Sequence, residues 1–170
     1  IASRCREELA SALRDGPPTA EAVSRLPYLE AVVKESLRLY PPAISVFLRQ
    51  ASRDLTIGGY DVPRNSLMTL SSVVTHHDPR WFPDPDRFDP ERFAAGRVET
   101  IPQYAYIPFG AGIRKCIGSG FAMVEGTLLL ATIARRRRLR PVPGHRFALL
   151  PQITLRPRGG LPMRVEARGS

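Results

Sequence analysis

The residue of this chain best placed to do chemistry is a cysteine in a glycine-rich loop. Cys116 ends the loop and is followed by a long apolar segment, residues 117–134, whose composition predicts a helix. The positive end of a helix dipole stabilises a thiolate at the helix N-terminus. Arg114 and Lys115 add positive charge beside the sulfur. A thiolate in such surroundings serves as a nucleophile or as a metal ligand.

The glycines and histidines of the chain bear on the choice between these two uses. Glycines on both sides of the cysteine leave the backbone uncluttered, as a broad, flat ligand over the loop requires. They are Gly110, Gly112, Gly118 and Gly120. A nucleophile needs a base, and none of the three histidines lies in a recognisable protease or transferase context. A buried structural thiol would not need two cations beside it, whereas an axial ligand of haem iron fits both features.

Three motifs, in order along the chain, resemble those of the cytochrome P450 family. Upstream, Glu35 and Arg38 match the E-x-x-R helix motif, and residues 90–93 match P-E-R-F. The loop matches the pattern F-x-x-G-x-R-x-C-x-G at Phe109, Gly112, Arg114, Cys116 and Gly118. The resemblance covers nearly the whole chain. It implies a fold that is mainly α with small β-sheets, the C-terminal part of the cytochrome P450 fold.

The resemblance also implies which residues bind the cofactor, haem b. Cys116 is expected to be the axial thiolate ligand of the iron and the catalytic residue. Arg114, Arg49 and His76 are expected to contact haem propionates. Phe109 is expected to pack against the thiolate and to shield the sulfur from water. The loop glycines expected to complete the cofactor contacts are Gly110, Gly112 and Gly118.

A second group of predicted site residues consists of Glu35, Arg38 and Arg92. Glu35 and Arg38 are three residues apart, so they are neighbours on one helix face, opposite the apolar stripe of that helix. Periodicity alone predicts an exposed ion pair there, of little energetic weight. The resemblance implies instead a buried network, in which Glu35 pairs with both arginines and ties the coil before the loop to the helix.

The composition and the net charge of the chain limit the kinds of partner that it can bind. The 170 residues carry a net charge of +9, nearly all from arginine, and are 43% apolar, which suits one globular domain. A basic net charge makes nucleic acid and acidic proteins candidate partners. The arginines are scattered and form no aromatic-basic nucleic-acid motif, which disfavours nucleic-acid binding. The densest run, residues 135–138 with Arg140, is interpreted as a solvated helix C-terminus or as a docking patch. Two cysteines make no disulfide framework, which fits a reducing compartment.

The apolar segment 117–134 has the length of a membrane span and a basic flank. Glu125, Ser119 and three glycines within it predict a buried core helix instead, so no membrane partner is expected from this segment. The chain begins with Ile1, and the family is usually more than twice as long. Residues 1–170 are therefore interpreted as the C-terminal, haem-thiolate part of a single P450 domain. The central helix that activates oxygen in the family is expected in the missing N-terminal half.

The sequence pattern predicts where the elements lie. Helices are expected over residues 3–13, 19–25 and 27–40, with stops at Gly16–Pro18 and at Pro41. Strands are expected over residues 45–51, 55–57, 60–62, 67–74, 147–155 and 162–165, the last two around a turn at 159–160. Gly58 and Gly59 predict a hairpin. A turn or short helix at 76–79 and a proline-rich coil over 79–108 precede the cysteine loop.

The resemblance implies a haem-thiolate monooxygenase that inserts one oxygen atom of O2 into a hydrophobic organic substrate. A redox partner of the ferredoxin or flavodoxin type would supply electrons and dock on Arg114, Lys115 and the arginine run. Residues 43–48 and 150–153 resemble two family segments that line the substrate pocket. A peroxide-using or isomerising haem enzyme, an inactive truncated fragment and a basic binding module remain open. The excess of arginine over lysine indicates a GC-rich genome and hence a bacterial protein, and the low cysteine content favours the cytoplasm.

Overall fold

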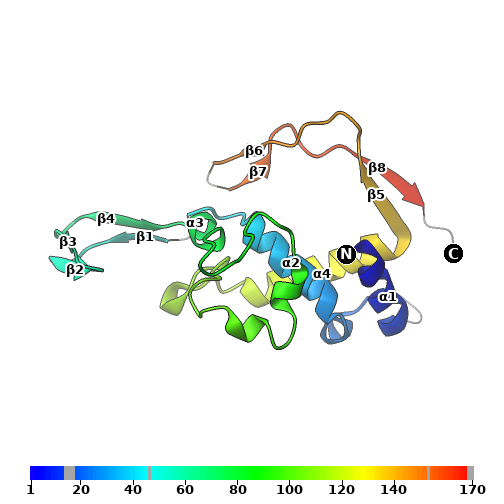
Figure 1. The fold of residues 1–170 in the computed structure, drawn as a ribbon, viewed down its shortest axis with the longest axis horizontal. Helices are drawn as coiled ribbons and strands as arrows, with labels where there is room; N and C mark the ends of the chain where they lie inside the picture. Colours follow the sequence, from blue (N-terminus) through cyan, green and yellow to red (C-terminus); the bar gives the residue numbers. More distant parts are fainter. Residues whose placement is uncertain (14–17, 46, 153, 168–170) are drawn as a thin grey trace.

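The computed structural model describes residues 1–13, 18–45, 47–152 and 154–167 (Figure 1). Within them, helices form the centre and narrow two-stranded sheets extend to either side, in agreement with the predicted mainly α fold with small β-sheets. Gly16 and Pro17, predicted to end the first helix, lie outside the described residues. So do Val46 and Ile153 of the two segments predicted to line a substrate pocket.

Helices form over the predicted N-terminal stretches and after the cysteine. They are α1 (Ala2–Ala12), η1 (Ala20–Arg25), α2 (Pro27–Leu39), α3 (Ser72–His76) and α4 (Ser119–Arg136). Single 3₁₀ turns lie in the coil and in the cysteine loop: η2 (Pro90–Phe93), η3 (Val98–Thr100) and η4 (Gly112–Arg114). The P-E-R-F motif is therefore one tight turn, and another tight turn ends two residues before Cys116.

The core forms where α2 packs against α1 and α4. Leu29 of α2 has no exposed surface and lies in one apolar cluster with Leu9 of α1 and Ala131 of α4. Leu29 and Val32 of the apolar stripe predicted for α2 are buried, whereas Val33 and Leu37 are half-buried and Tyr40 is 46% exposed. The predicted stripe is therefore confirmed in its first half, and its last residue faces solvent. Burying such a stripe is the main contribution that holds a short helix in place, because helices of this length are marginal on their own.

A residue of α1 closes the N-terminus of α2. The N-cap residue of α2 makes no side-chain cap hydrogen bond. The carboxylate of Glu8 accepts the N–H groups of Tyr28 (2.7 Å) and Leu29 (2.9 Å) instead. The first N–H groups of a helix have no partner within the helix, and a negative charge there is also favoured by the dipole. The first helix thus fixes the start of the second.

In the described residues the strands pair two by two, always antiparallel. The pairs are β1 (Phe47–Gln50) with β4 (Leu67–Leu70), β2 (Leu55–Ile57) with β3 (Tyr60–Val62), β5 (Arg137–Pro141) with β8 (Met163–Ala167), and β6 (Leu149–Leu150) with β7 (Arg156–Pro157). The predicted hairpin is confirmed, because Ile57 pairs with Tyr60 across Gly58 and Gly59, whose φ angles are 57° and 85°. Figure 1 shows this hairpin beyond the β1–β4 ribbon, away from the helices.

Three of the predicted elements differ from the structure. The strand expected over 67–74 ends at Leu70, and α3 follows, with the hydroxyl of buried Ser72 donating to the carbonyl of Ala43 (2.8 Å). This tertiary contact overrides the β-propensity of the following valines. The strand expected over 147–155 shrinks to β6, which pairs with β7. The strand at 162–165 is part of β8 and pairs with β5 instead of folding back across the 159–160 turn.

The arginine run crosses the end of a helix. α4 ends at Arg136, and the next arginines belong to β5, whose residues are all exposed. The interpretation as a helix C-terminus is therefore right for the first two arginines only. Arg140 pairs with Glu166 of β8 at 2.9 Å on the protein surface, where such an ion pair adds little stability.

One side of α4 is buried and the other is open. Thr127 and Ala131 have no exposed surface, whereas Phe121 and Leu129 are 73% and 56% exposed. The prediction of a buried core helix therefore holds for one face. Among the described residues, no helix is both long enough and apolar enough to cross a membrane.

Candidate functional site

The cysteine loop folds back on itself and presents the thiol of Cys116. The cysteine is exposed, and its N–H donates to the carbonyl of Phe109 (2.9 Å). Gly110 and Gly112 have φ angles of 76° and 67°, a region in which a side chain is strained. The carbonyl of Cys116 accepts the N–H of Ser119 (3.3 Å), the first residue of α4. The sulfur thus lies just before a helix N-terminus, where the unpaired N–H groups favour a negative charge.

Apolar side chains are exposed on both sides of this thiol. Ile113 and Ile117 are fully exposed, at 101% and 104%. At Gly118 an added Cβ would lie 3.9 Å from Sγ of Cys116, so glycine leaves the sulfur accessible from that side. Arg114 is exposed on η4 beside the isoleucines. An accessible sulfur, flanking apolar groups and a nearby cation suit a flat, largely apolar ligand that carries an anionic edge.

Glu35 and Arg38 form a fully buried ion pair. Nε of Arg38 donates to Oε2 of Glu35 (2.7 Å), and Nη2 donates to Oε1 (2.9 Å). Neither side chain has any exposed surface. The exposure predicted from periodicity is therefore wrong. Its physical reason is that η2 and α3 pack on the face of α2 opposite the core, which a helical periodicity cannot reveal.

Arg92 joins this pair from η2. Its Nε lies 3.6 Å from Oε1 of Glu35, an ion pair beyond hydrogen-bond distance, and its Nη2 donates to the carbonyl of Asp84 (2.8 Å). The N–H of Asp89 donates to the same Oε1 of Glu35 (2.8 Å). The structure thus brings the three predicted residues together, with one carboxylate facing both guanidinium groups.

Arg38 also holds the end of α3 and the coil that follows by their backbones. Its Nη1 donates to the carbonyl of His76 (2.8 Å) and its Nη2 to that of Arg87 (3.2 Å). The guanidinium lies over the ring of Phe82, 5.2 Å from the ring centroid. Its donors are distributed between a carboxylate and two carbonyls, so the buried charge is well compensated.

His76, predicted to contact a propionate, lies inside the protein. It has no exposed surface, its Nδ1 bonds to the carbonyl of Arg38 (3.2 Å), and its Nε2 accepts the N–H of Ile107 (2.9 Å). Its ring stacks on Tyr106, with 5.3 Å between centroids. Burial lowers the pKa of His76 to about 4. Both ring nitrogens are engaged within the protein, so neither is free to meet a propionate.

The remaining predicted cofactor contacts lie on separate elements. Arg49 is exposed on β1, and its Nη1 donates to the carbonyl of Leu48 (2.9 Å). Arg114 precedes Cys116 by two residues. The half-buried Phe109 contacts the cysteine through the backbone hydrogen bond described above, and packing of its ring against the sulfur stays a prediction.

A cavity of about 560 Å³ joins the two segments predicted to line a substrate pocket. Ile44 comes from the first segment and Pro151 from the second. The other residues that line it are Leu39, Tyr40, Ser71, Val73, His77, Asp86, Leu149 and Leu155. Most of these side chains are apolar, as a site for a hydrophobic ligand requires.

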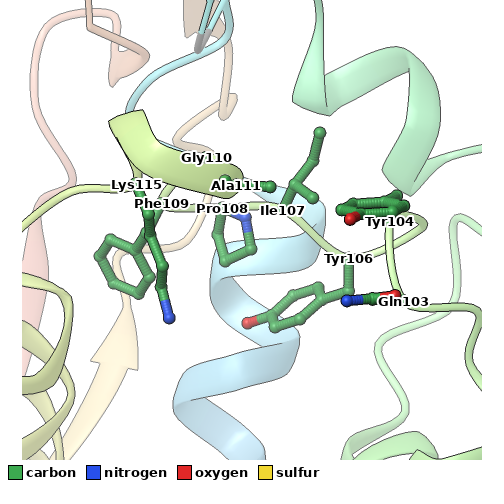
Figure 2. A pocket seen from close by; sticks show the side chains of 10 residues that line it. Gln103, Tyr104, Tyr106, Ile107, Pro108, Phe109, Gly110, Ala111 and Lys115 are labelled. Atoms are coloured by element: carbon green, nitrogen blue, oxygen red, sulfur yellow. The ribbon is translucent and has the colours of Figure 1, made fainter.

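A second hollow, of about 380 Å³, lies against the cysteine loop. Figure 2 shows its lining, with Lys115 and Phe109 at one end and Tyr104 at the other, above the helix α2. Tyr106 lies at its base and donates its hydroxyl to the carbonyl of Lys34 of α2 (3.0 Å). This hollow thus has an exposed cation of the loop at one end and the exposed ring of Tyr104 at the other.

The sequence and the fold both identify the family. A sequence model of the family described as Cytochrome P450 matches residues 1–159. The chain belongs to the cytochrome P450 family. Among P450 relatives, "Cyclooctat-9-en-7-ol 5-monooxygenase" of Streptomyces melanosporofaciens is 43% identical over 144 residues, which are 85% of this chain and 31% of that protein. "Cytochrome P450 4V2" of Homo sapiens is 37% identical over 157 residues, 92% of this chain and 30% of that protein.

Solved P450 structures share the fold of the chain. "Retinoic acid bound cyanobacterial CYP120A1" superposes with a TM-score of 0.92 at 31% identity and covers 98% of this chain, which is 38% of that one. A second P450 structure, CYP102L1, gives a TM-score of 0.87 at 33% identity. The expected P450 fold is confirmed, and the family implies a haem-iron cofactor. The chain spans about a third of the length of these curated relatives and structures.

Sequence reasoning missed two residues that shape the site. Asp89 caps η2, because its carboxylate accepts the N–H of Glu91 (3.1 Å). An acidic residue directly before a proline is a recognisable start signal for such a turn. The cap at Asp89 could therefore have been predicted from the sequence. Glu8, which closes α2, lies 20 residues from its nearest partner, and no local pattern indicates that contact.

Proposed function

We propose that the complete protein is a haem-thiolate monooxygenase, and that residues 1–170 are the C-terminal, haem-binding part of its single domain. The observation that supports this most directly is the exposed thiol of Cys116, which lies before α4 between fully exposed isoleucines. A site of this kind suits one axial ligand to haem b and an apolar surface for the macrocycle.

Different residues of the chain would contact different parts of the cofactor. Cys116 would ligate the iron through its thiolate, and Ile113 and Ile117 would pack against the macrocycle. Arg114 and Arg49 would neutralise the propionates. When bound, haem with a thiolate ligand supplies the activation of dioxygen and the cleavage of its O–O bond. The backbone hydrogen bonds of Cys116 to Phe109 and Ser119 would keep the sulfur oriented at the start of α4.

A hydrophobic organic molecule is the substrate class that the described residues favour. The cavity to which Ile44 and Pro151 contribute is lined mainly by apolar side chains. Apolar walls with a few polar groups give such a cavity affinity for apolar ligands through desolvation. Ser71, His77 and Asp86 are the polar groups that could orient an alcohol or a carbonyl there.

We further propose that an acidic electron donor of the ferredoxin or flavodoxin type docks beside the cysteine loop. Lys115 and Arg114 are exposed next to Cys116, and the hollow in Figure 2 lies at the same loop. Attraction between opposite charges speeds association and weakens with salt. Exchanging Lys115 for Glu is expected to slow reduction of the haem and to flatten its dependence on salt. Unchanged rates at low and high salt would refute this docking site.

The preference for arginine over lysine and the two matched Streptomyces proteins support a bacterial source. Cys5 and Cys116 form no disulfide within the part of the chain that the structure describes, which accords with the proposal of a cytoplasmic protein.

The test of the proposed function is a reduced, carbon-monoxide difference spectrum of the complete protein. The wild type is expected to show the red-shifted Soret band of a thiolate-ligated haem, and Cys116→Ala to lose it. Cys5→Ala is the matched control, because Cys5 is buried in α1 and away from the loop, and it is expected to keep the band. A wild type without the band would favour an inactive fragment or a binding module. A band without oxygenation, but with turnover of peroxides, would favour the peroxide-using or isomerising alternative.

A further inference from the structure

His76 is a buried titratable residue to which the proposed reaction assigns no part. It ends α3, has no exposed surface, and lies between the network helix α2 and the segment that leads into the cysteine loop. Its ring packs face to face with Tyr106 and edge to face with Phe82, whose centroid lies 6.4 Å away. A polar ring in such surroundings costs free energy unless both of its nitrogens are hydrogen-bonded.

The hydrogen bonds fix the protonation state of the ring. The carbonyl of Arg38 can only accept, so Nδ1 of His76 carries the hydrogen in their 3.2 Å contact. The N–H of Ile107 can only donate, so Nε2 is the unprotonated acceptor in their 2.9 Å contact. A protonated ring would have two donors and would lose the bond to Ile107. The pKa of about 4 that burial gives His76 agrees with a neutral ring at neutral pH.

The bond to Ile107 reaches the thiol loop through backbone contacts. The carbonyl of Ile107 accepts the N–H of Gly110 (3.0 Å), which starts the turn of the loop. The carbonyl of Phe109 accepts the N–H of Cys116 (2.9 Å) and closes it. The N–H of Ile107 is buried and bonds to a ring on another element, so it fixes where the loop leaves the coil. The bond that Ile107 donates to His76 therefore anchors the start of the loop, next to the hydrogen bond from Tyr106 to α2.

We propose that His76 is a positioning residue that holds the cysteine loop against the α2 network. The proposal rests on the proposed function, because the position of Cys116 matters only if its sulfur binds a ligand. One ring links the backbone of Arg38 to the backbone of Ile107. Arg38 returns the contact by donating to the carbonyl of His76 (2.8 Å). The buried Glu35–Arg38 pair thereby acts on the thiolate loop as well as on the coil around η2.

Two substitutions separate the two bonds of the ring. The side-chain amide of His76→Asn reaches the position of Nδ1 and can still donate to Arg38, but it leaves the N–H of Ile107 unpaired. The carbonyl of His76→Gln reaches the position of Nε2 and can still accept from Ile107. If His76 only filled space in the core, the Asn and Gln variants would behave alike. His145→Asn is the control, because His145 is exposed on a distant turn.

The experiment measures amide hydrogen exchange at Ile107 and the carbon-monoxide spectrum in the complete holoprotein. His76→Asn is expected to speed exchange at Ile107 by roughly 5- to 150-fold, the cost of an unpaired buried N–H expressed as an opening equilibrium. It is also expected to convert part of the red-shifted band to the form without thiolate ligation. His76→Gln is expected to stay within about twofold of the wild type in exchange, as is His145→Asn.

Several results would overturn the positioning role. Asn and Gln variants that behave alike would do so, including a shared failure to fold, because the bond to Ile107 would then not be the decisive one. Unchanged exchange at Ile107 in His76→Asn would do so as well. The proposed function fails separately, through a wild-type protein without the thiolate band, while exchange at Ile107 is measured without reference to the cofactor.

Discussion

Removing the carboxylate of Glu35 gives the sharpest test of how the site is held. In Glu35→Ala, the guanidinium of Arg38 keeps its two carbonyl partners but loses its counter-charge, and that of Arg92 loses the same counter-charge. The N–H of Asp89 loses its acceptor. Arg38 is fully buried and Arg92 is 7% exposed, so water replaces little of what is lost.

The magnitude follows from these contacts. Breaking a buried ion pair by removing one partner costs about 3–5 kcal/mol, and an unpaired buried N–H adds about 1–3 kcal/mol. Together they take a large share of the roughly 5–15 kcal/mol by which a protein is stable. Glu35→Ala is therefore expected to unfold at much lower urea concentration and to retain no haem. The coil around η2 loses its attachment to α2 at the same time.

The control lies one turn earlier on the same helix. Glu30 pairs with Lys34 at 2.8 Å, both partly exposed, in the i, i+4 arrangement. Glu30→Ala is expected to cost only about 0.3–0.5 kcal/mol. The assay compares the urea midpoints of the two variants and the haem bound per protein after gel filtration. A Glu35→Ala protein that binds haem fully and unfolds within about 1 kcal/mol of Glu30→Ala would refute the network reasoning.

Two further outcomes are expected from the contacts described above. The pKa of His76 is about 6.5 in the unfolded chain and about 4 in the folded one. Because folding lowers this pKa, the neutral ring contributes fully to stability above pH 6.5, and the contribution is lost as the pH falls through 4. At most about 3 kcal/mol is involved, and urea midpoints measured from pH 7 to pH 4 should fall less steeply in His76→Gln than in the wild type. Glu8→Gln leaves one of the two N–H groups at the start of α2 with a neutral acceptor and the other with none, and it is expected to lower stability by about 1 kcal/mol. The exposed neighbour Glu7, changed to Gln, should alter the thermal midpoint hardly at all, and equal effects of the two changes would contradict the capping role.

The sequence predicts best where a single residue type dictates local geometry. Gly58 and Gly59 supply the positive φ angles of a tight hairpin, and the structure has the hairpin there. Pro27 starts α2 as its rigid φ angle favours. The spacing of the apolar residues of α2 likewise indicates the face that meets α1 and α4.

Features that depend on distant partners could not be read from local patterns. Glu35 and Arg38 look like a solvent-facing pair on a helical wheel, because their covering partners lie 54 and 38 residues further along the chain. The buried network was predicted from the resemblance to the family, whereas the helical periodicity predicted an exposed pair. The pairing of β5 with β8 is also remote, and it takes three of the arginines out of the predicted helix end. The two hydrogen bonds of His76 reach 38 residues back and 31 residues forward, which no motif around it indicates.

The coil between α3 and the cysteine loop depends for its shape on Glu35 and Arg38 of α2 and on Arg4 of α1. Its carbonyls at Asp84 and Arg87 accept from guanidinium groups that depend on Glu35, and Glu91 pairs with Arg4 of α1. Contacts this far apart in sequence require long loops to close. The position of the sulfur therefore depends on the coil, and the shape of the coil depends on α1 and α2. It follows that a chain whose coil is not docked on α2 would carry its cysteine on a loop without support, and that coil docking and cofactor binding would stabilise one another.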